Sequence, residues 1–166
     1  MDKKNSYRHI PSKSWDKHCF GCSPDNPSGL QMKFYTDEKS IYSKLKVPGH
    51  LCGWDNLVHG GVISTILDEV MGWAPIHLHK LIVLTKTMTV DFIQPVFLDD
   101  ELKAEAWITK LDDDGEVIVD ATLHNGQGEL CARSTGVFSY FPPATIKEMG
   151  IMDDTCLKEF EKYIAE

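Results

Sequence analysis

The residues best suited to chemistry lie near the middle of the chain. His59, Gly60 and Gly61 stand where a helix is predicted to begin. Glycines there let another group approach the backbone, and the unpaired N–H groups of a helix start carry a partial positive charge. Such a place can hold a carbonyl oxygen that becomes negative during a reaction. Spacing alone also allows the plainer interpretation, in which the two glycines only permit tight entry into the helix.

Asp68 favours the chemical interpretation. A carboxylate in the middle of a buried helix carries a large desolvation cost unless it is hydrogen-bonded or faces a wet cavity. Small neighbours on its side of the helix leave room for a ligand, although a structural network around Asp68 is the alternative. Glu69 points away from this side and is expected to be structural or exposed at an interface. At 100° per residue, the residues that share the side of Asp68 are Gly61, Ser64, Thr65 and Gly72.

The elements that must position these groups follow from hydrophobic patterning. Residues 59–79 form a helical stretch that is apolar on most of its circumference, which is typical of a buried helix. The four long strands predicted after it are joined by turns of two to five residues, which implies antiparallel neighbours. A curved antiparallel sheet wrapped around one helix would bury both helix faces, an α+β arrangement. The strands are expected at 30–35, 41–47, 81–96, 101–111, 116–125 and 129–140.

The chain is expected to form one domain with two extensions. Residues 1–29 are polar and turn-rich and predict an irregular arm, and residues 30–142 form the folded domain. Residues 143–166 are a C-terminal extension, in which a short amphipathic helix is predicted from Asp153.

Charge and cysteine content narrow the partners and the compartment. The 166 residues carry a net charge of −8, which disfavours nucleic acid and anionic lipid as partners. Residues 1–50 nevertheless carry a net charge of +4, so an anionic ligand is expected there. Five scattered cysteines and the lack of an apolar signal segment or membrane span predict a cytoplasmic protein.

Three segments in order resemble the hotdog-fold acyl-CoA thioesterases of the PaaI-like branch. The first is His18-Cys-Phe-Gly-Cys-Ser-Pro-Asp-Asn-Pro-Ser-Gly-Leu30 in the arm, and the second is the His59-Gly60-Gly61 start with Asp68 following. The third is Val90-Asp-Phe-Ile-Gln-Pro95. The resemblance covers residues 18–141 and implies a hotdog fold. It also implies hydrolysis of an acyl-CoA thioester to a carboxylic acid and free CoA.

The resemblance also implies roles for single residues. The Gly61 N–H would polarise the thioester carbonyl, Asp68 would act as general base or nucleophile, and Thr85 would position water. His59 would shape the turn. Relatives carry an Asn six residues before the His, where this chain has Gly53, so either Asn56 substitutes or the water is held differently.

Further expectations concern the substrate and the assembly. Trp54 lies in the loop beside the presumed site and is expected to touch substrate, together with Asn56, His59, Gly60, Ser64 and Thr65. No cofactor is expected, because coenzyme A is part of the substrate. Relatives dimerise through sheet edges and often form tetramers, so Gly61 and Asp68 are expected to face each other across a homodimer or a dimer of dimers.

The sequence also bears on three other interpretations. Cys19 and Cys22 have zinc-ligand spacing, but no second pair of ligands is spaced to complete a structural site, so no metal is predicted. A hotdog hydratase or dehydratase needs a catalytic His in a hydration loop, and that arrangement is not found. A non-catalytic acyl-thioester binding protein is a further alternative, although a buried carboxylate without a use is costly.

Overall fold

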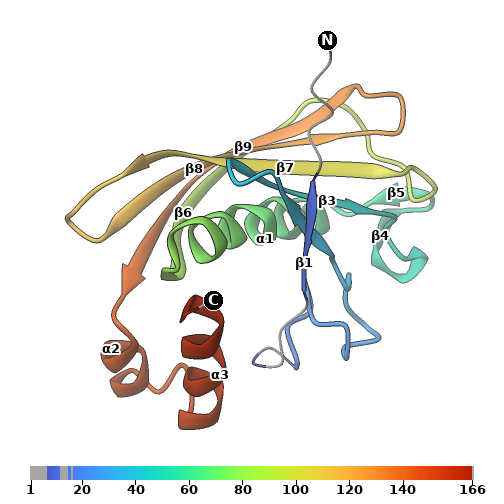
Figure 1. Ribbon diagram of the computed structural model, residues 1–166. Helices are drawn as coiled ribbons and strands as arrows, with labels where there is room; N and C mark the ends of the chain where they lie inside the picture. Colours follow the sequence, from blue (N-terminus) through green and yellow to red (C-terminus); the bar gives the residue numbers. More distant parts are fainter. Residues whose placement is uncertain (1–6, 12–14, 16, 166) are drawn as a thin grey trace.

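A curved antiparallel sheet and one long helix dominate the molecule (Figure 1). The computed structural model describes residues 7–11, 15 and 17–165, and over these the sheet has seven strands in the order β1-β2-β3-β7-β8-β9-β6. All neighbouring strands pair antiparallel. The strands are β1 (Arg8–Ile10), β2 (Phe34–Thr36), β3 (Ser40–Leu45), β6 (Ile82–Phe92), β7 (Leu102–Leu111), β8 (Glu116–His124) and β9 (Leu130–Phe141).

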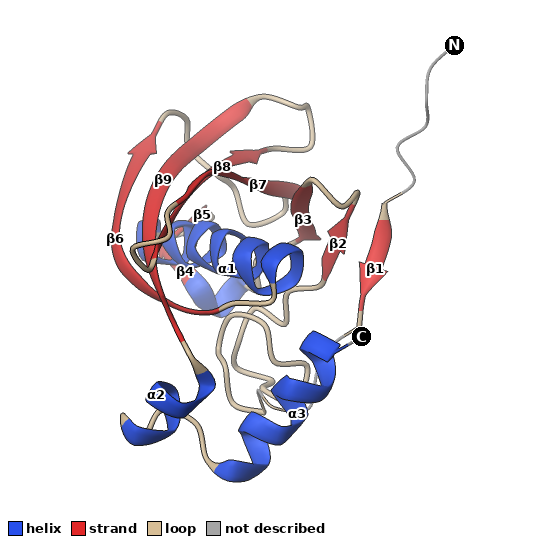
Figure 2. Cartoon of the chain, turned by 60° about the vertical axis from the view of Figure 1, so that its left-hand side comes forward, coloured by secondary structure: helices blue, strands red, loops and turns tan. Residues whose placement is uncertain are grey.

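The helix α1 (Gly60–His79) lies in the concave side of this sheet, as Figure 2 shows. Alternate residues of β8 are buried, which is the pattern of a strand with one face on a core. α1 itself buries most of its circumference. The α+β arrangement expected from the patterning is therefore confirmed, and it is the hotdog fold that the resemblance implies. The buried residues of α1 are Ile63, Ile66, Leu67, Val70, Met71, Trp73, Ala74, Pro75 and His77.

A small hairpin leads into α1. The 3-10 helix η1 (Gly49–Leu51) is followed by β4 (Cys52–Trp54) and β5 (Leu57–Val58), which pair with each other. The N–H of Val58 donates to the carbonyl of Val96 at 2.9 Å, and the N–H of Leu98 donates to the carbonyl of Asn56 at 2.9 Å. These bonds fix the start of the helix against the segment that follows β6.

Two helices close the chain, α2 (Pro143–Glu148) and α3 (Asp154–Ala165). Phe160 and Tyr163 of α3 are buried, and both rings pack against Trp15 of the arm. Tyr163 also bonds to His77 near the end of α1, through its hydroxyl and the ring Nδ1 at 2.5 Å. α3 therefore joins the arm to the far end of the central helix. None of the described helices is long and apolar enough to span a membrane.

The predicted elements agree with the structure except in the arm, at the start of the first strand, at the end of the first long strand and after β9. The arm was expected to be irregular, but it contains β1, which pairs with β2. The first predicted strand begins at Phe34 and not at residue 30, because the N–H groups of Leu30 and Met32 donate to Phe20 and Gly21 of the arm. The first long strand ends at Phe92, and α2 was not predicted. The division into arm, domain and extension remains a prediction.

Candidate functional site

His59 caps the start of α1. It is the N-cap residue, and its ring Nδ1 accepts a hydrogen bond from the N–H of Gly61 at 2.9 Å. A side chain at Gly61 would place its Cβ 3.1 Å from that nitrogen, which explains the glycine. The N–H expected to polarise a carbonyl is thus already engaged within the chain. A ligand oxygen would share it in a three-centre bond or replace His59.

Asp68 and Thr85 lie side by side. The Thr85 hydroxyl donates to the Asp68 carboxylate, Oγ1 to Oδ1, at 2.8 Å. Thr85 stands on β6 at a register shift, because Thr85 pairs with Phe138 while Thr87 pairs with Val137. A bulge of this kind redirects side chains beside functional sites. The structure therefore joins two of the residues predicted to be catalytic, Asp68 and Thr85, by a direct hydrogen bond.

The environment of Asp68 tunes its acidity. Burial raises the pKa of the Asp68 carboxyl above its ordinary value, and the hydrogen bond from Thr85 opposes that rise. The side chain is half-buried, so water can reach it. A carboxylate with these properties is suited to take a proton from a water molecule near neutral pH.

Gly61 and Asp68 do not meet within one chain. They are seven residues apart on α1, which is nearly two turns and about 10.5 Å along the axis. A thioester carbon and its oxygen are joined by one bond, so a single helix cannot present both groups to the same carbonyl. The two groups share a side of α1 but lie at different levels.

The two hydroxyls between them are used locally. Ser64 donates to the carbonyl of Gly60 at 3.0 Å, and Thr65 donates to the carbonyl of Gly61 at 2.9 Å. Such bonds to the preceding turn are common for hydroxyls inside helices. Ser64 and Thr65 therefore keep the Asp68 side of α1 lined by small side chains. Their hydroxyl oxygens can still accept hydrogen bonds from a ligand.

The hairpin residues Trp54 and Asn56 lie at the edge of the site. Trp54 is 81% exposed, which is unusual for so large an apolar side chain. Asn56 is also exposed, and its carbonyl holds the segment after β6. A Cβ at Gly53 would lie 3.1 Å from the Cα of His59, so a larger residue there would press on the helix cap.

An apolar surface surrounds the start of α1, and sequence reasoning missed it. Phe92, Ile93 and Phe97 are exposed by 56%, 46% and 44%. The Phe92 ring lies 3.6 Å from the position of a Cβ on Gly60, and Phe97 bridges to Leu57 of the hairpin. Exposed apolar groups of this size mark a surface that binds an apolar group or another chain.

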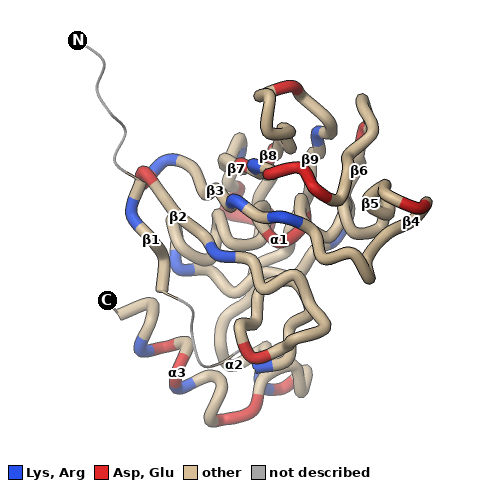
Figure 3. The backbone as a smooth tube through the Cα atoms, turned by 90° about the vertical axis from the view of Figure 1, so that its right-hand side faces the viewer, with Lys and Arg blue, Asp and Glu red and all other residues tan. Residues whose placement is uncertain are grey.

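A basic cleft opens beside η1. It has a volume of about 600 Å³, and none of the described residues that line it is acidic. His50 lines it, and the next residue, Leu51, accepts a hydrogen bond from the N–H of His59 at 3.3 Å. Figure 3 shows the basic segments gathered over β1 to β3. The cations of the cleft are Lys33, Lys44 and Lys46.

The arm lysines expected to meet an anion are placed differently. Lys13 lies outside the described residues. Lys17 lines another cleft, of about 510 Å³, together with Asp153 and Glu159 of the C-terminal segment. The acids there offset its charge, so the lysines beside η1 are better placed for an anionic ligand.

Glu69 meets the two arm cysteines. Its carboxylate Oε1 lies 3.2 Å from the Cys19 sulfur, and the two sulfurs are 3.4 Å apart. Burial, with the charge of Cys19, raises the pKa of Glu69 to about 8. The hydrogen bond to Cys19, together with burial, raises the pKa of the Cys22 thiol. Glu69 was expected to be structural or exposed at an interface, and its contact with the arm agrees with the structural alternative.

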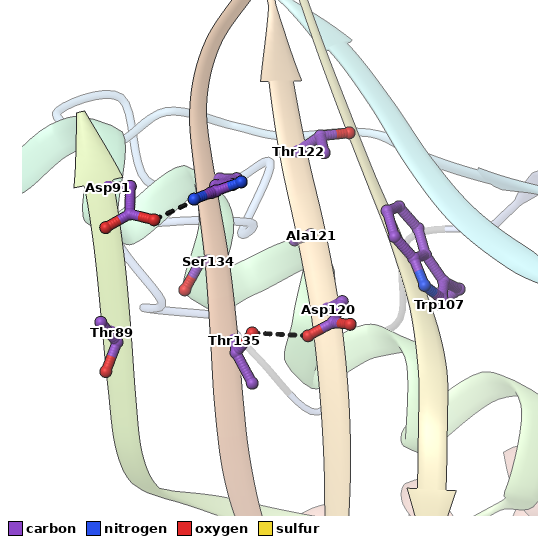
Figure 4. Close-up of a pocket in the computed structure, with 9 residues that line it drawn as sticks. Thr89, Asp91, Trp107, Asp120, Ala121, Thr122, Ser134 and Thr135 are labelled. Atoms are coloured by element: carbon purple, nitrogen blue, oxygen red, sulfur yellow. Dashed lines mark hydrogen bonds and ion pairs between the residues drawn. The ribbon is translucent and has the colours of Figure 1, made fainter. Parts of the chain in front are cut away.

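The convex face of the sheet carries a separate polar cleft of about 360 Å³ (Figure 4). Its polar and charged groups hydrogen-bond to one another across strands. Arg133 donates to Asp91 at 2.8 Å, and the Thr135 hydroxyl donates to Asp120 at 2.6 Å. The residues on either side of Asp120 in β8 are buried, so Asp120 points away from α1. This cleft is therefore on the opposite face of the sheet from Asp68.

Comparison with known proteins finds a family match for the central segment of the chain. Residues 55–132 match the model of the thioesterase superfamily. The match covers just under half of the chain, and over this central segment the chain is similar to the thioesterase superfamily. The matched segment runs from the hairpin through α1 and into β9, and it therefore contains the helix start, Asp68 and Thr85. A search of curated proteins gave no match.

Solved structures of superfamily proteins share the fold. The E. coli PaaI protein from the phenylacetic acid degradation operon is 20% identical with a TM-score of 0.62, over 68% of this chain and 81% of PaaI. A Streptococcus pneumoniae hypothetical thioesterase with coenzyme A is 19% identical with a TM-score of 0.59, over 63% and 80%. A further thioesterase superfamily protein is 18% identical with a TM-score of 0.68, over 74% of this chain and 60% of its own length.

Proposed function

We propose that the protein hydrolyses an acyl-CoA thioester to a carboxylic acid and free CoA. The observation that carries the proposal is the half-buried Asp68 carboxylate, held by the Thr85 hydroxyl at 2.8 Å inside a thioesterase-superfamily segment. The S. pneumoniae relative, which was solved with coenzyme A, has also been solved with an Asp or a Thr replaced by Ala. Those are the residue types of the Asp68–Thr85 pair.

The chemistry needs one base and one oxyanion site. As general base, Asp68 takes a proton from water, and the resulting hydroxide attacks the thioester carbon. The carbonyl oxygen becomes negative and is stabilised by an N–H at a helix start, for which Gly61 is the candidate. The intermediate collapses, the C–S bond breaks, and the departing CoA thiolate receives the proton from Asp68. Attack by the Asp68 carboxylate itself is the other route, with an anhydride intermediate that water hydrolyses.

The separation of Gly61 and Asp68 supports a homodimeric site. One chain holds these groups about 10.5 Å apart along α1, so a complete site pairs Asp68 of one chain with Gly61 of the other. β6 is an edge strand of the sheet, and the exposed Phe92 lies at its end. An uncovered edge of this length is the kind of surface that sheet-to-sheet pairing covers.

The charge pattern suggests where coenzyme A lies. The phosphates would occupy the cleft of Lys33, Lys44 and Lys46, and the pantetheine would pass His50 toward the helix start. Trp54 and Phe92 would contact the acyl group or the thioester arm, since both are exposed and apolar. The Asn expected at Gly53 is absent, and Asn56 is the candidate that replaces it.

Thiol release from a panel of short-chain, long-chain and aromatic acyl-CoAs tests the activity. We expect hydrolysis of at least one member by the native chain and a loss of about 10²- to 10⁴-fold in kcat for Asp68→Asn. Equal activity in Asp68→Asn would remove Asp68 from the mechanism. If no member of the panel is hydrolysed but CoA thioesters still bind, the protein is instead a non-catalytic acyl-thioester binding protein. That alternative is favoured by the Gly61 N–H, which is already hydrogen-bonded to His59.

The proposed CoA cleft has its own test. The double variant Lys44→Glu with Lys46→Glu should raise KM for acyl-CoA at least tenfold and leave kcat within about twofold, because the cleft contacts only the phosphates. The matched control is Lys162→Glu, a charge reversal on α3 outside the cleft. An unchanged KM in the double variant would show that the nucleotide binds elsewhere.

A further inference from the structure

We propose that Cys19, Cys22 and Glu69 form a zinc site, in which a water molecule completes the coordination. The two cysteines come from the arm and the glutamate from α1, and their ligand atoms all lie within 4.8 Å of one another. The inference is independent of the proposed thioesterase activity.

The distances are close to those of a tetrahedral zinc site. With Zn–S near 2.3 Å and Zn–O near 2.1 Å, two sulfurs are about 3.8 Å apart and a sulfur and an oxygen about 3.6 Å apart. The sulfurs of Cys19 and Cys22 are 3.4 Å apart, and the Cys19 sulfur is 3.2 Å from Glu69 Oε1. Lengthening each of these two distances by about 0.4 Å would bring it to its tetrahedral value. The Cys22 sulfur and the Glu69 ligand oxygen lie within 4.8 Å of each other.

The arm is folded to present both sulfurs to α1. The N–H of Cys22 donates to the Cys19 sulfur at 3.4 Å, which stabilises a thiolate there. The carbonyls of Phe20 and Gly21 accept from residues 30 and 32, so the turn is pinned on its other side. A Cβ at Gly21 would lie 2.4 Å from the Glu69 carboxyl carbon. A glycine between the cysteines is therefore what lets the carboxylate reach them.

The charges of the cluster call for a cation. Cys19, Cys22 and Glu69 would together carry three negative charges when ionised, and Asp68, the preceding residue on α1, is a further acid. A divalent ion bound by two thiolates and a carboxylate reduces that charge to one. Without a metal the groups must hold protons, which the metal displaces on binding.

The donor set selects zinc. Two thiolates and one carboxylate suit Zn²⁺, which accepts sulfur and oxygen ligands in tetrahedral sites, while magnesium and calcium require oxygen ligands. The sulfurs are well beyond the roughly 2.05 Å of a disulfide. A disulfide would also give the Glu69 carboxylate no partner of opposite charge. Bound zinc would tie the arm to α1 one residue away from Asp68.

Metal titration of the full chain tests the site. Protein stripped with a chelator and kept reduced should bind one Zn²⁺ per chain, measured by elemental analysis. It should also bind Co²⁺ with the thiolate-to-cobalt charge-transfer absorption that only sulfur ligands give. Zinc should raise the midpoint of thermal unfolding, since it binds the folded chain.

Variants locate the ion. Zinc affinity should fall in each of the variants Cys19→Ser, Cys22→Ser and Glu69→Gln. Loss of a residue that only hydrogen-bonds to a metal ligand lowers affinity roughly 10- to 100-fold, so loss of a ligand should cost at least that much. Cys52→Ser is the matched control, because Cys52 is exposed on β4 away from the cluster, and it should bind zinc like the native chain.

Three results would overturn the proposal. The first is native protein that binds neither ion, and the second is cobalt bound without charge-transfer absorption. These two measurements use the native chain, so a variant that fails to fold does not affect them. The third is zinc affinity in Cys22→Ser and Glu69→Gln equal to that of the native chain.

Discussion

Replacing Thr85 with Val removes the hydroxyl that donates to Asp68 and keeps a β-branched side chain in β6. A hydrogen bond to a charged group contributes about 1.5 to 3 kcal/mol. Asp68 is half-buried and water can partly replace the donor, so the lower figure applies. That corresponds to a loss of about tenfold in kcat if the bond holds the carboxylate in its reactive position.

The pH dependence supplies a second, independent readout. The Thr85 bond lowers the pKa of Asp68, so its removal raises that pKa. A general base works only when ionised, and the acidic limb of kcat/KM should therefore move to higher pH in Thr85→Val. The assay is thiol release measured from pH 4 to pH 9 with saturating and limiting acyl-CoA.

The chain offers a matched control for this variant. Thr135 makes the same kind of bond to Asp120, at 2.6 Å, on the opposite face of the sheet. Thr135→Val should leave kcat and the acidic limb unchanged, and Thr85→Ser, which keeps the hydroxyl, should restore both. The reasoning is refuted if Thr85→Val has the native kcat and the native pH profile.

Three further predictions concern the frame around the site. Gly29→Ala places a Cβ 2.3 Å from the carbonyl oxygen of Phe20, and since backbone cannot move aside cheaply, it should cost at least about 1 to 3 kcal/mol in urea unfolding. Phe160→Ala should cost about 3 to 5 kcal/mol by the same measurement, because that ring is 1% exposed; a loss below 1 kcal/mol would show that α3 is not packed as described. His59→Ala should lower stability by about 0.5 to 2 kcal/mol through loss of the cap on Gly61, while retaining more activity than Asp68→Asn; a dead enzyme would make His59 a catalytic residue.

The main elements of the fold could be predicted from the sequence, because each has a local signal. α1 was expected at 59–79 and observed at Gly60–His79, since its apolar residues follow a helical period. The strands after α1 are separated by short turns, and turn residues are also a local sequence signal. β1 carries no such signal. Its three residues form a strand only because they pair with β2, and a local sequence pattern does not reveal that pairing.

Only part of the candidate site could be predicted from the sequence. Asp68 could be found from its place on a buried helix, and Thr85 from family resemblance. The structure then brings their oxygens to 2.8 Å. For Glu69, the helical period showed which way the side chain points but not that the arm packs against it. The spacing of Cys19 and Cys22 was the sequence signal for the proposed zinc site. The third ligand, Glu69, comes from a helix distant in sequence, so the spacing did not reveal it.

One comparison tests the central claim most directly: kcat/KM for thiol release by Asp68→Asn against that by Asp120→Asn. Both variants replace a carboxylate that accepts a hydrogen bond from a threonine hydroxyl with the corresponding amide. One carboxylate is on α1 and the other is on the convex face of the sheet. We predict a loss of at least about 100-fold for Asp68→Asn and a value within about twofold of native for Asp120→Asn. Equal values for the two variants would contradict a mechanism in which Asp68 acts on the thioester.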